Sequence, residues 1–202
     1  MTHGILSDRA IVAAITQGDI EIDPFDRKQL NPASYDLTLG DEVVVYDQWC
    51  WCTAAVNGRD HANRGEALVP RQDILDVKDE PKVNRFKIGD DGWILKPVIG
   101  YLMATRERVL AKKYVPVLDG KSSIGRLFVS IHECAGFGDA GFDGQYTLEV
   151  TVKHSIRLYA GMRIAQIRFH TMVGEPLHPY DGQYKGDTAR GPVASRAWRM
   201  FR

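Results

Sequence analysis

The chain has 202 residues, and its 26 Lys and Arg balance its 26 Asp and Glu, so the formal net charge is zero. This length allows one domain with a real core, and a neutral chain has no overall attraction for nucleic acid or an anionic membrane. An anionic ligand must therefore be held by a local cluster. No apolar run approaches the roughly 20 residues that span a bilayer, and no secretion signal is visible. Three cysteines argue against a disulfide framework, so we expect a reduced, cytoplasmic protein, in the host cytoplasm if the gene is viral.

The N-terminal residues predict a helix over about 8–17. Ser7 suits the N-cap and Gly18 the stop, and Ile11 and Ile15 lie on one apolar face. Most of the remaining chain consists of short apolar segments between Gly and Pro. The strands that we expect cover about 35–39, 43–46, 92–98, 101–104, 127–132, 145–152 and 163–169. This pattern predicts a mainly β protein, a distorted barrel or jelly-roll-like sandwich with few short helices.

We expect a single domain over residues 1–202 with two less regular parts. Residues 57–87 are polar and weakly patterned, and they predict an insertion or long loop with a short helix near 73–77. Residues from about 174 to 202 are rich in Gly, Pro and polar groups, and they predict a tail that orders on a partner or ligand. No pattern explains the final residues 198–202.

Two cysteines, Cys50 and Cys52, are separated by one residue and flanked by Trp49 and Trp51. Zinc sites normally place two to four residues between paired cysteines. The His-x-Glu and Pro-Cys-x-x-Cys motifs of zinc nucleobase deaminases do not occur in the chain. We therefore expect no catalytic zinc, and we interpret residues 49–52 as a buried or interfacial strand.

The stretch Asp119-Gly120-Lys121-Ser122-Ser123-Ile124-Gly125-Arg126-Leu127 is the strongest candidate for a binding site. Asp-Gly predicts a turn, after which the serine pair can begin a short helix. Backbone N–H groups at a helix start, two hydroxyls and a lysine suit a polyphosphate. On a helix, Arg126 shares a face with Ser122. The alternative is a Ser-capped surface helix with solvated charges.

A carboxylate on the strand expected at 145–152 is the candidate acid and base. Leu148 and Val150 lie on one face of that strand, and Glu149 lies on the other with Thr147 and Thr151. One carboxyl group can move all the protons of a hydrolysis if its pKa is raised toward neutrality. From the pattern alone, a solvent-exposed glutamate on a half-buried strand is the more ordinary interpretation.

Five blocks in order cover most of the chain: Asn31–Gly40, Asp119–Leu127, Gly138–Val150, Gly161–Ile167 and Arg190–Arg196. This ordered set resembles the dCTP deaminase and dUTPase superfamily. The Gly-Lys-Ser-Ser-x-x-Arg and Thr-Leu-Glu blocks resemble the deaminase branch, since plain dUTPases do not usually carry that Arg and Glu pair. The resemblance implies a dUTPase-type fold and a homotrimer with active sites between subunits.

The resemblance also implies roles for residues of the second and third blocks. Glu149 would be the acid and base of a deamination without a metal, while Ser122 and Arg126 would fix the water and the base beside it. Arg126 could also stabilise charge that develops on the ring. Lys121 and Ser123 would hold phosphates. For Arg126, an ordinary ion pair with a surface carboxylate is the alternative.

Three further residues resemble the base and sugar contacts of the family. Asp139 would meet the sugar 3′-hydroxyl, and Phe142 would pack on the deoxyribose and exclude a 2′-hydroxyl. Ala135 would touch the base through its backbone. A turn aspartate and a core ring are the alternatives for the first two. Gly136 replaces a His that is common in the family, which predicts a roomier pocket wall and leaves a 5-substituted cytosine open as substrate.

The last two blocks resemble phosphate contacts and a closing lid. Gln166, Tyr180 and Lys185 are the expected phosphate contacts, and residues 191–196 resemble the lid. Asp36, in the first block, is expected to be mainly structural.

The first expectation is a dCTP deaminase that makes dUTP and ammonia from a deoxycytidine triphosphate carrying Mg²⁺ on its phosphates. Feedback by dTTP in the same pocket is implied by the resemblance, and neither nucleic acid nor membrane is an expected partner. The alternative is a bifunctional deaminase and diphosphatase that gives dUMP, since the aspartate that matches Asp139 in dUTPases orients the water for the α-phosphate. A catalytically silent nucleotide-binding protein is the third possibility.

Overall fold

The computed structural model describes residues 4–47, 49–52, 67–70, 74–178, 180–184 and 191–202, with the backbone alone for 49–52 and 67–70. The fold is mainly β, as predicted. The helices are α1 (Asp8–Thr16), η1 (Arg27–Gln29), α2 (Ser122–Gly125) and η2 (Ala197–Phe201). The strands are β1 (Ile20–Asp23), β2 (Leu30–Asn31), β3 (Ser34–Tyr46), β4 (Trp49–Cys52), β5 (Ala67–Pro70), β6 (Val83–Lys87), β7 (Trp93–Leu95), β8 (Tyr101–Ala111), β9 (Tyr114–Gly120), β10 (Val129–Ser130), β11 (Asp143–Val152), β12 (Ile156–Leu158) and β13 (Arg163–Thr171).

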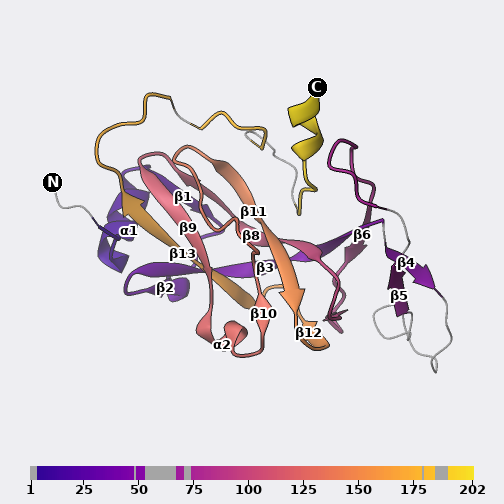
Figure 1. Cartoon of the computed structure of the whole chain (residues 1–202). Coiled ribbons are helices and arrows are strands. Elements are labelled where there is room, and N and C mark those ends of the chain that lie inside the picture. The colour runs from indigo at the N-terminus through magenta and orange to yellow at the C-terminus, as the bar shows by residue number, and fades with distance from the viewer. Residues whose placement is uncertain (1–3, 48, 53–66, 71–73, 179, 185–190) are drawn as a thin grey trace.

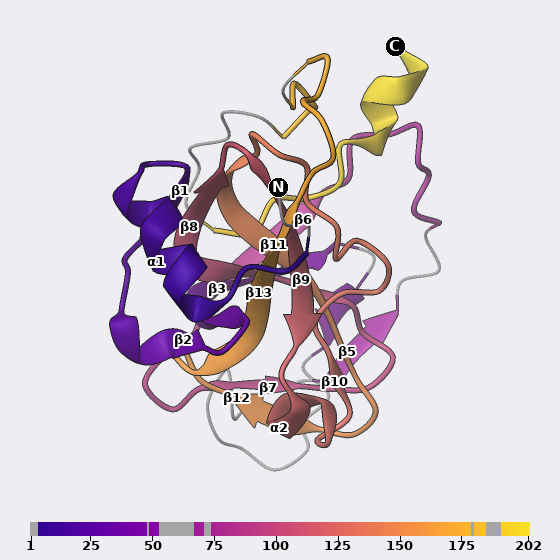
Figure 2. The same cartoon turned by 90° about the vertical axis from the view of Figure 1, so that its left-hand side faces the viewer.

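The main sheet has the strand order β10-β11-β8-β3-β13-β9, and β1, β2 and β6 pair at its sides. The long strand β3 is its centre because it pairs antiparallel with β8, β13, β6 and β2 along different parts of its length. Figures 1 and 2 show the strands curling into a nearly closed barrel, with α1 beside β1 and α2 at one end. The barrel-type fold predicted from the strand pattern is confirmed.

The core fills the inside of this barrel. Leu148 and Val150 of β11 and Ile164 and Ile167 of β13 are fully buried. Each side chain of this kind contributes about 1.5–3 kcal/mol when it leaves water. The residues between them on β11 are half-buried, so the predicted alternation holds and turns Glu149 away from the core.

The N-terminal helix forms where the sequence predicts it. Ser7 caps it, with its Oγ accepting a hydrogen bond from the N–H of Ala10 at 3.4 Å. Gly18, just beyond the helix end, has a φ of 74°, which glycine adopts without strain. Ile11 is fully buried and anchors the helix to the barrel.

Several strand boundaries differ from those predicted. Residues 35–39 and 43–46 belong to the single strand β3, and the segment expected at 101–104 continues to Ala111 as β8. The segments expected at 92–98 and 127–132 shorten to β7 and β10. Positive φ angles at Val98 and Phe128, 74° and 55°, keep these two residues out of the strands, because extended backbone cannot continue through them.

The region expected as a loop contains strands. Val83–Lys87 forms β6 and pairs with β3, and Phe86 stacks near Trp93 with ring centroids 5.2 Å apart. Lys87 and the other charged side chains obscured this strand signal. The short helix predicted at 73–77 was wrong for residues 74–77, which are irregular, whereas residue 73 lies outside the described chain.

The C-terminal segment begins beside β11 of its own chain, where Gly191 and Val193 hydrogen-bond to its side chains, and η2 projects beyond the strands (Figure 1). The prediction of a partner-ordered tail did not foresee these contacts. Within the described residues, no helix is long and apolar enough to cross a membrane.

Candidate functional site

The residues predicted for the site lie in two groups on different elements. The α2 group lies on α2 and the neighbouring strands. The β11 group lies on β11 and the loop before it, together with Tyr180 from the segment after β13. The α2 group comprises Lys121, Ser122, Ser123, Arg126 and Gln166. The β11 group comprises Ala135, Asp139, Phe142, Glu149 and Tyr180.

The single helical turn of α2 arranges the α2 group. It follows β9 directly, and the N–H of Arg126 donates to the carbonyl of Ser122 at 3.1 Å. This closes the turn and brings residues 122 and 126 to the same side, as the spacing predicts. The side chains of Ser122, Ser123 and Arg126 are exposed, so all three are accessible to a ligand or a neighbouring subunit.

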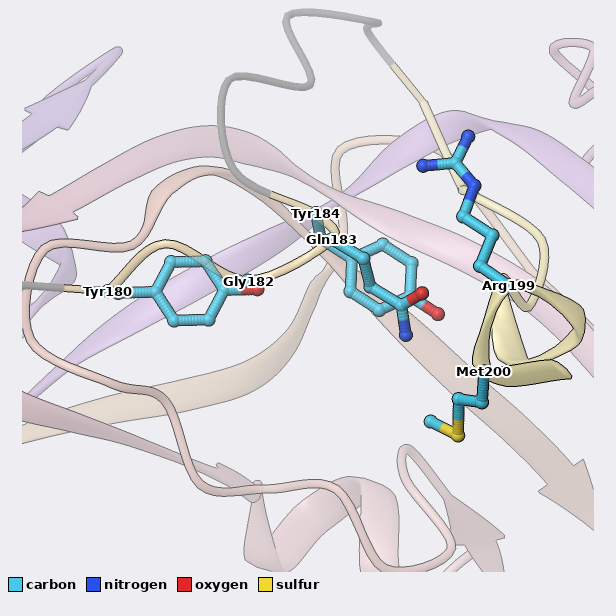
Figure 3. A pocket seen from close by; sticks show the side chains of 6 residues that line it. All are labelled: Tyr180, Gly182, Gln183, Tyr184, Arg199 and Met200. Atoms are coloured by element: carbon cyan, nitrogen blue, oxygen red, sulfur yellow. The ribbon is translucent and has the colours of Figure 1, made fainter. Parts of the chain in front are cut away.

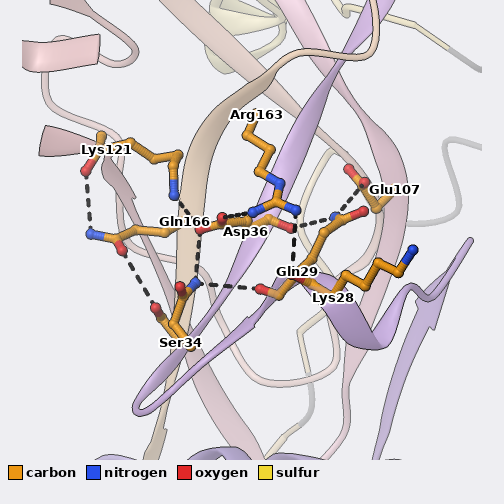
Figure 4. Close-up of polar contacts among 10 residues, drawn as sticks. Lys28, Gln29, Ser34, Asp36, Glu107, Lys121, Arg163 and Gln166 are labelled. Carbon is orange, nitrogen blue, oxygen red and sulfur yellow. Dashed lines mark hydrogen bonds and ion pairs between the residues drawn. The ribbon is translucent and has the colours of Figure 1, made fainter. Parts of the chain in front are cut away.

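A buried carboxylate holds the lysine of this group (Figure 4). Asp36 is 1% exposed; its Oδ1 lies 2.5 Å from Lys121 Nζ, and its Oδ2 lies 3.4 Å from Arg163 Nη1. Asn31 Nδ2 also donates to Oδ1 at 2.8 Å. Two cations therefore share the buried Asp36 carboxylate.

Gln166 lies beside this cluster (Figure 4). Its Nε2 donates to the carbonyl of Gly120 at 3.3 Å, and its Oε1 accepts from Ser34 Oγ at 3.4 Å. The prediction that Gln166 and Lys121 belong to one site is compatible with this placement, because both flank the end of β9.

A second buried carboxylate supports Asp36 from inside. Glu107 is 1% exposed and accepts from Thr38 Oγ1 at 2.7 Å, from the N–H of Thr38 at 2.9 Å and from Gln29 Nε2 at 3.1 Å. Gln29 Nε2 also donates to the carbonyl of Asp36 at 2.7 Å. The network fixes the backbone of β3 under the cation cluster.

In the β11 group, Glu149 faces the loop that precedes β11. Its Oε2 accepts from the N–H of Glu133 at 3.0 Å, and Glu133 Oε1 accepts from Thr151 Oγ1 at 2.6 Å. Glu149 is half-buried, and Ala135, two residues beyond Glu133, is exposed. The carboxylate is therefore next to the backbone that was predicted to touch the base.

Three aromatic rings gather at the turn that precedes β11. The Phe142 ring lies 5.0 Å from that of Tyr146 and 5.8 Å from that of Tyr180, edge to face. The N–H of Tyr180 donates to the carbonyl of Ala140 at 3.2 Å. Burial raises the pKa of Tyr146, and the charge of Asp139 raises it further. Asp139 and Phe142 thus share one turn, on which Tyr180 rests.

A neighbouring histidine lies beside Gly136, and the expectation of a roomier pocket wall there stays a prediction. A Cβ at this position would lie 2.8 Å from the carbonyl oxygen of Leu118 and 2.9 Å from His132 Nε2. The imidazole of His132 occupies the space that a side chain at 136 would need. Gly136 therefore gives no observation in favour of a 5-substituted cytosine.

The C-terminal segment follows the polar face of β11. The N–H of Gly191 donates to Gln145 Oε1 at 2.7 Å, and the N–H of Val193 donates to Thr147 Oγ1 at 3.0 Å. Because Thr147 and Glu149 point the same way on the strand, the segment ends close to the candidate acid and base.

Two tyrosines hold the next turn of this segment. The N–H of Ser195 donates to the Tyr46 hydroxyl, and the N–H of Arg196 donates to the Tyr184 hydroxyl, both at 3.1 Å. Burial raises the pKa of Tyr46, and the charges of Tyr184 and Glu149 add to the shift.

An open cavity of about 520 Å³ lies between this tail and the segment before it (Figure 3). Its lining consists of Tyr180, Gly182, Gln183, Tyr184, Arg199 and Met200. Lys185, the remaining predicted phosphate contact, lies outside the described residues.

The described residues contain no group of three or more His, Cys, Asp or Glu side chains that could hold a metal ion. Residues 49–52 form the strand β4, paired with β5, as expected, although the side chains of Cys50 and Cys52 are not described. Cys134 is free and exposed.

The two groups are separate within one chain. None of the hydrogen bonds or ion pairs among the described residues joins a member of the α2 group to a member of the β11 group. Polar contacts within one chain therefore do not link the two groups in the described part of the molecule.

Comparison with known proteins defines the class. The family model described as dCTP deaminase-like matches residues 5–172, and the chain belongs to this family. The resemblance predicted from the five blocks is confirmed.

Among its relatives, the chain is 38% identical over 188 residues to "dCTP deaminase, dUMP-forming" of Clostridium acetobutylicum, covering 93% of this chain and 94% of the relative. It is 37% identical to the protein of that name from Leptospira biflexa, with 86% of each covered. The 2′-deoxycytidine 5′-triphosphate deaminase structure from Agrobacterium tumefaciens matches 85% of this chain and 49% of its own, with a TM-score of 0.59 and 23% identity. This structural likeness confirms the fold.

Arg163 was not predicted as a member of the site. It stands in the Gly161–Ile167 block, where only Gln166 was singled out. A positive side chain at the start of a strand usually indicates a solvated end, so its partner on β3 had to be seen in three dimensions.

Proposed function

We propose that this protein hydrolyses dCTP to dUMP, with release of ammonia and diphosphate. The names of the two curated relatives support the dUMP-forming alternative over the first expectation of free dUTP. The observation that carries the proposal is the position of Glu149, on the polar face of β11 and hydrogen-bonded to the loop that holds Ala135.

In the first step, water adds to the ring carbon that bears the amino group. Glu149 takes one proton of the water and delivers it to ring N3 as the hydroxide adds to the carbon. It then carries the remaining hydroxyl proton to the amino nitrogen, so that ammonia leaves as the carbonyl forms. Because Oε2 already accepts from the N–H of Glu133, we assign Oε1 to the water. The net change is dCTP plus water to dUTP plus ammonia.

In the second step, a further water attacks the α-phosphorus, and the bond to the bridging oxygen of diphosphate breaks. We assign the orientation of this water to Asp139, whose carboxylate lies on the exposed turn before β11. Asp139 also receives the sugar 3′-hydroxyl in this proposal. Phe142 packs on the deoxyribose, with its ring held by Tyr146 and Tyr180.

The α2 group binds the rest of the substrate in this proposal. Ser122 and Arg126 reach the water and the base, and Lys121, Ser123 and Gln166 take the triphosphate. The two cations at Asp36 and the exposed hydroxyls of α2 support this assignment. Tyr180 and Lys185 are the further phosphate contacts, and residues 191–196 are the lid.

Because the two groups do not meet within one chain, we propose a homotrimer in which one subunit supplies the α2 group and its neighbour supplies the β11 group. Exposed Leu127 and Phe128, 45% and 63% accessible beside α2, support an interface there. A mixture of two variants, each lacking a different group, tests this arrangement. Glu149→Gln and Arg126→Ala chains, each inactive alone, should regain activity when unfolded and refolded together.

Mg²⁺ enters this account as part of the substrate. Asp36, the buried carboxylate nearest the α2 group, is already bound by Lys121 and Arg163, so it does not offer a vacant ligand for a protein-held ion. We therefore propose that Mg²⁺ arrives on the triphosphate oxygens. Inhibitory dTTP would use the same sugar and triphosphate contacts.

The test of the function is a product analysis with dCTP and Mg²⁺ that follows ammonia, dUTP, dUMP and diphosphate together. The proposal predicts equal amounts of ammonia, dUMP and diphosphate, with little free dUTP. Ammonia with accumulating dUTP would contradict the second step. Binding of dCTP without ammonia would indicate a silent nucleotide-binding protein.

A further inference from the structure

The cation cluster around Asp36 raises a problem for the proposed phosphate contact of Lys121. Lys121 Nζ is 2.5 Å from the Asp36 carboxylate, and that carboxylate is 1% exposed. A buried charge that loses its counter-ion is strongly destabilised. A phosphate can therefore draw Lys121 away only if another group keeps Asp36 neutralised.

Arg163 is placed to do this. Its Nη1 lies 3.4 Å from Asp36 Oδ2, the oxygen that Lys121 does not contact. Its Nη2 donates to the carbonyl of Lys28 at 3.3 Å, which ties the guanidinium to the chain before β3. Since an Arg guanidinium stays charged and presents several fixed donors, it can hold Asp36 while Lys121 moves.

Resting on the function proposed above, we propose that Arg163 is a positioning residue for the triphosphate: by neutralising Asp36 it allows Lys121 Nζ to turn to the phosphates. With Arg163 present, Asp36 keeps one cation when Lys121 turns away, so the lysine is available to the ligand. Without it, Lys121 and Asp36 cancel and the lysine stays paired inside the barrel wall.

The experiment measures binding rather than turnover. Calorimetric Kd values for dCTP and dCMP with Mg²⁺ are taken in a Glu149→Gln parent, so that the substrate is not consumed. Arg163→Gln removes the charge but retains an amide donor for the Lys28 carbonyl, and Arg163→Lys restores the charge. Lys113→Ala is the control, because Lys113 forms an exposed ion pair with Asp19 at 2.9 Å outside the cluster.

We expect Arg163→Gln to raise the Kd for dCTP about tenfold, the effect of weakening one charged contact, and to change the Kd for dCMP less than twofold. Arg163→Lys should recover most of the affinity, and Lys113→Ala should change neither Kd. In a Lys121→Ala background, Arg163→Gln should add little, because Arg163 acts through Lys121.

Two results would overturn the inference. An unchanged Kd for dCTP in folded Arg163→Gln would make Arg163 purely structural, and full additivity with Lys121→Ala would make it an independent phosphate contact. Failure of the function is distinct from these outcomes. If the wild type binds dCTP but releases no ammonia, only the proposed reaction is wrong. If the Glu149→Gln parent does not bind dCTP, both the proposed reaction and the role of Arg163 are wrong.

Discussion

The backbone N–H of Val193 donates to Thr147 Oγ1 at 3.0 Å, two residues before Glu149 on the same face of β11. The C-terminal segment is thereby registered against the strand that carries the candidate acid and base. Two further contacts flank this one in the sequence. The N–H of Gly191 donates to Gln145 Oε1, and the N–H of Ser195 donates to the Tyr46 hydroxyl.

The end of the chain anchors this segment, which gives the first prediction. Trp198 is 8% exposed, with the Arg202 and Arg199 guanidinium groups 4.2 and 5.2 Å from its ring. Trp198→Ala should therefore loosen the tail and increase amide hydrogen exchange at Val193 and Ser195 at least tenfold, while barrel amides keep their rates.

Met200→Ala is the matched control for Trp198→Ala, because Met200 belongs to the same short helix but is 74% exposed. It should leave the exchange rates of the tail close to those of the wild type. Equal exchange in the two variants would mean that Trp198 does not anchor the segment.

A second prediction concerns the buried carboxylate under the cation cluster. Glu107→Gln replaces one acceptor oxygen by an NH₂ group that would face Thr38 or Gln29 donors. A buried donor without an acceptor costs about 1–3 kcal/mol, so the free energy of unfolding should fall by that amount in urea titrations. The control is Glu21→Gln, because the Glu21 side chain is 43% exposed and forms a surface ion pair with Arg108. It should change the free energy of unfolding by less than about 1 kcal/mol. Equal losses in the two variants would contradict a stabilising role for the buried Glu107 network.

A third prediction follows from a buried phenol. Tyr101 is 1% exposed, and burial raises its pKa from 10.0 to about 12, although its hydroxyl accepts from the N–H of Lys96. The pKa of Tyr101 is higher in the folded protein than in the unfolded chain, so the buried neutral phenol stabilises the fold fully below pH 10. This contribution is lost as the pH rises from 10 to 12. The loss should be about 2–3 kcal/mol.

Urea unfolding of wild type and Tyr101→Phe at pH 9 to 12 measures this contribution as a difference between the two curves. The phenylalanine variant should lose less stability across that interval. Parallel curves would show that Tyr101 does not resist ionisation in the folded protein.

The sequence predicted the parts of this molecule that follow local rules. Ser7 and Gly18 marked the ends of α1, and the alternation around Glu149 identified its face, because capping and strand pleating depend on neighbouring residues. The five motifs identified the family, because their residue types and their order along the chain are both specific to it.

The parts that were missed depend on long-range contacts. Arg163 meets Asp36 only because β13 pairs with β3, and β6 is a strand because Val43 of β3 pairs with Phe86. The space beside Gly136 is filled by His132, which no spacing rule predicts. Tertiary pairing decided these cases.

Ammonia release by Glu149→Gln, measured with saturating dCTP beside Glu133→Gln, tests the central claim most directly. Glu133 is the carboxylate that Thr151 binds on the same face, so it is a close control. The account predicts that Glu149→Gln lowers kcat by about 10²–10⁴-fold with unchanged folding, since proton transfer by a positioned carboxyl contributes that much. Glu133→Gln should keep a kcat within about tenfold of wild type. Turnover by folded Glu149→Gln near the wild-type rate would contradict the assignment of Glu149 as the acid and base.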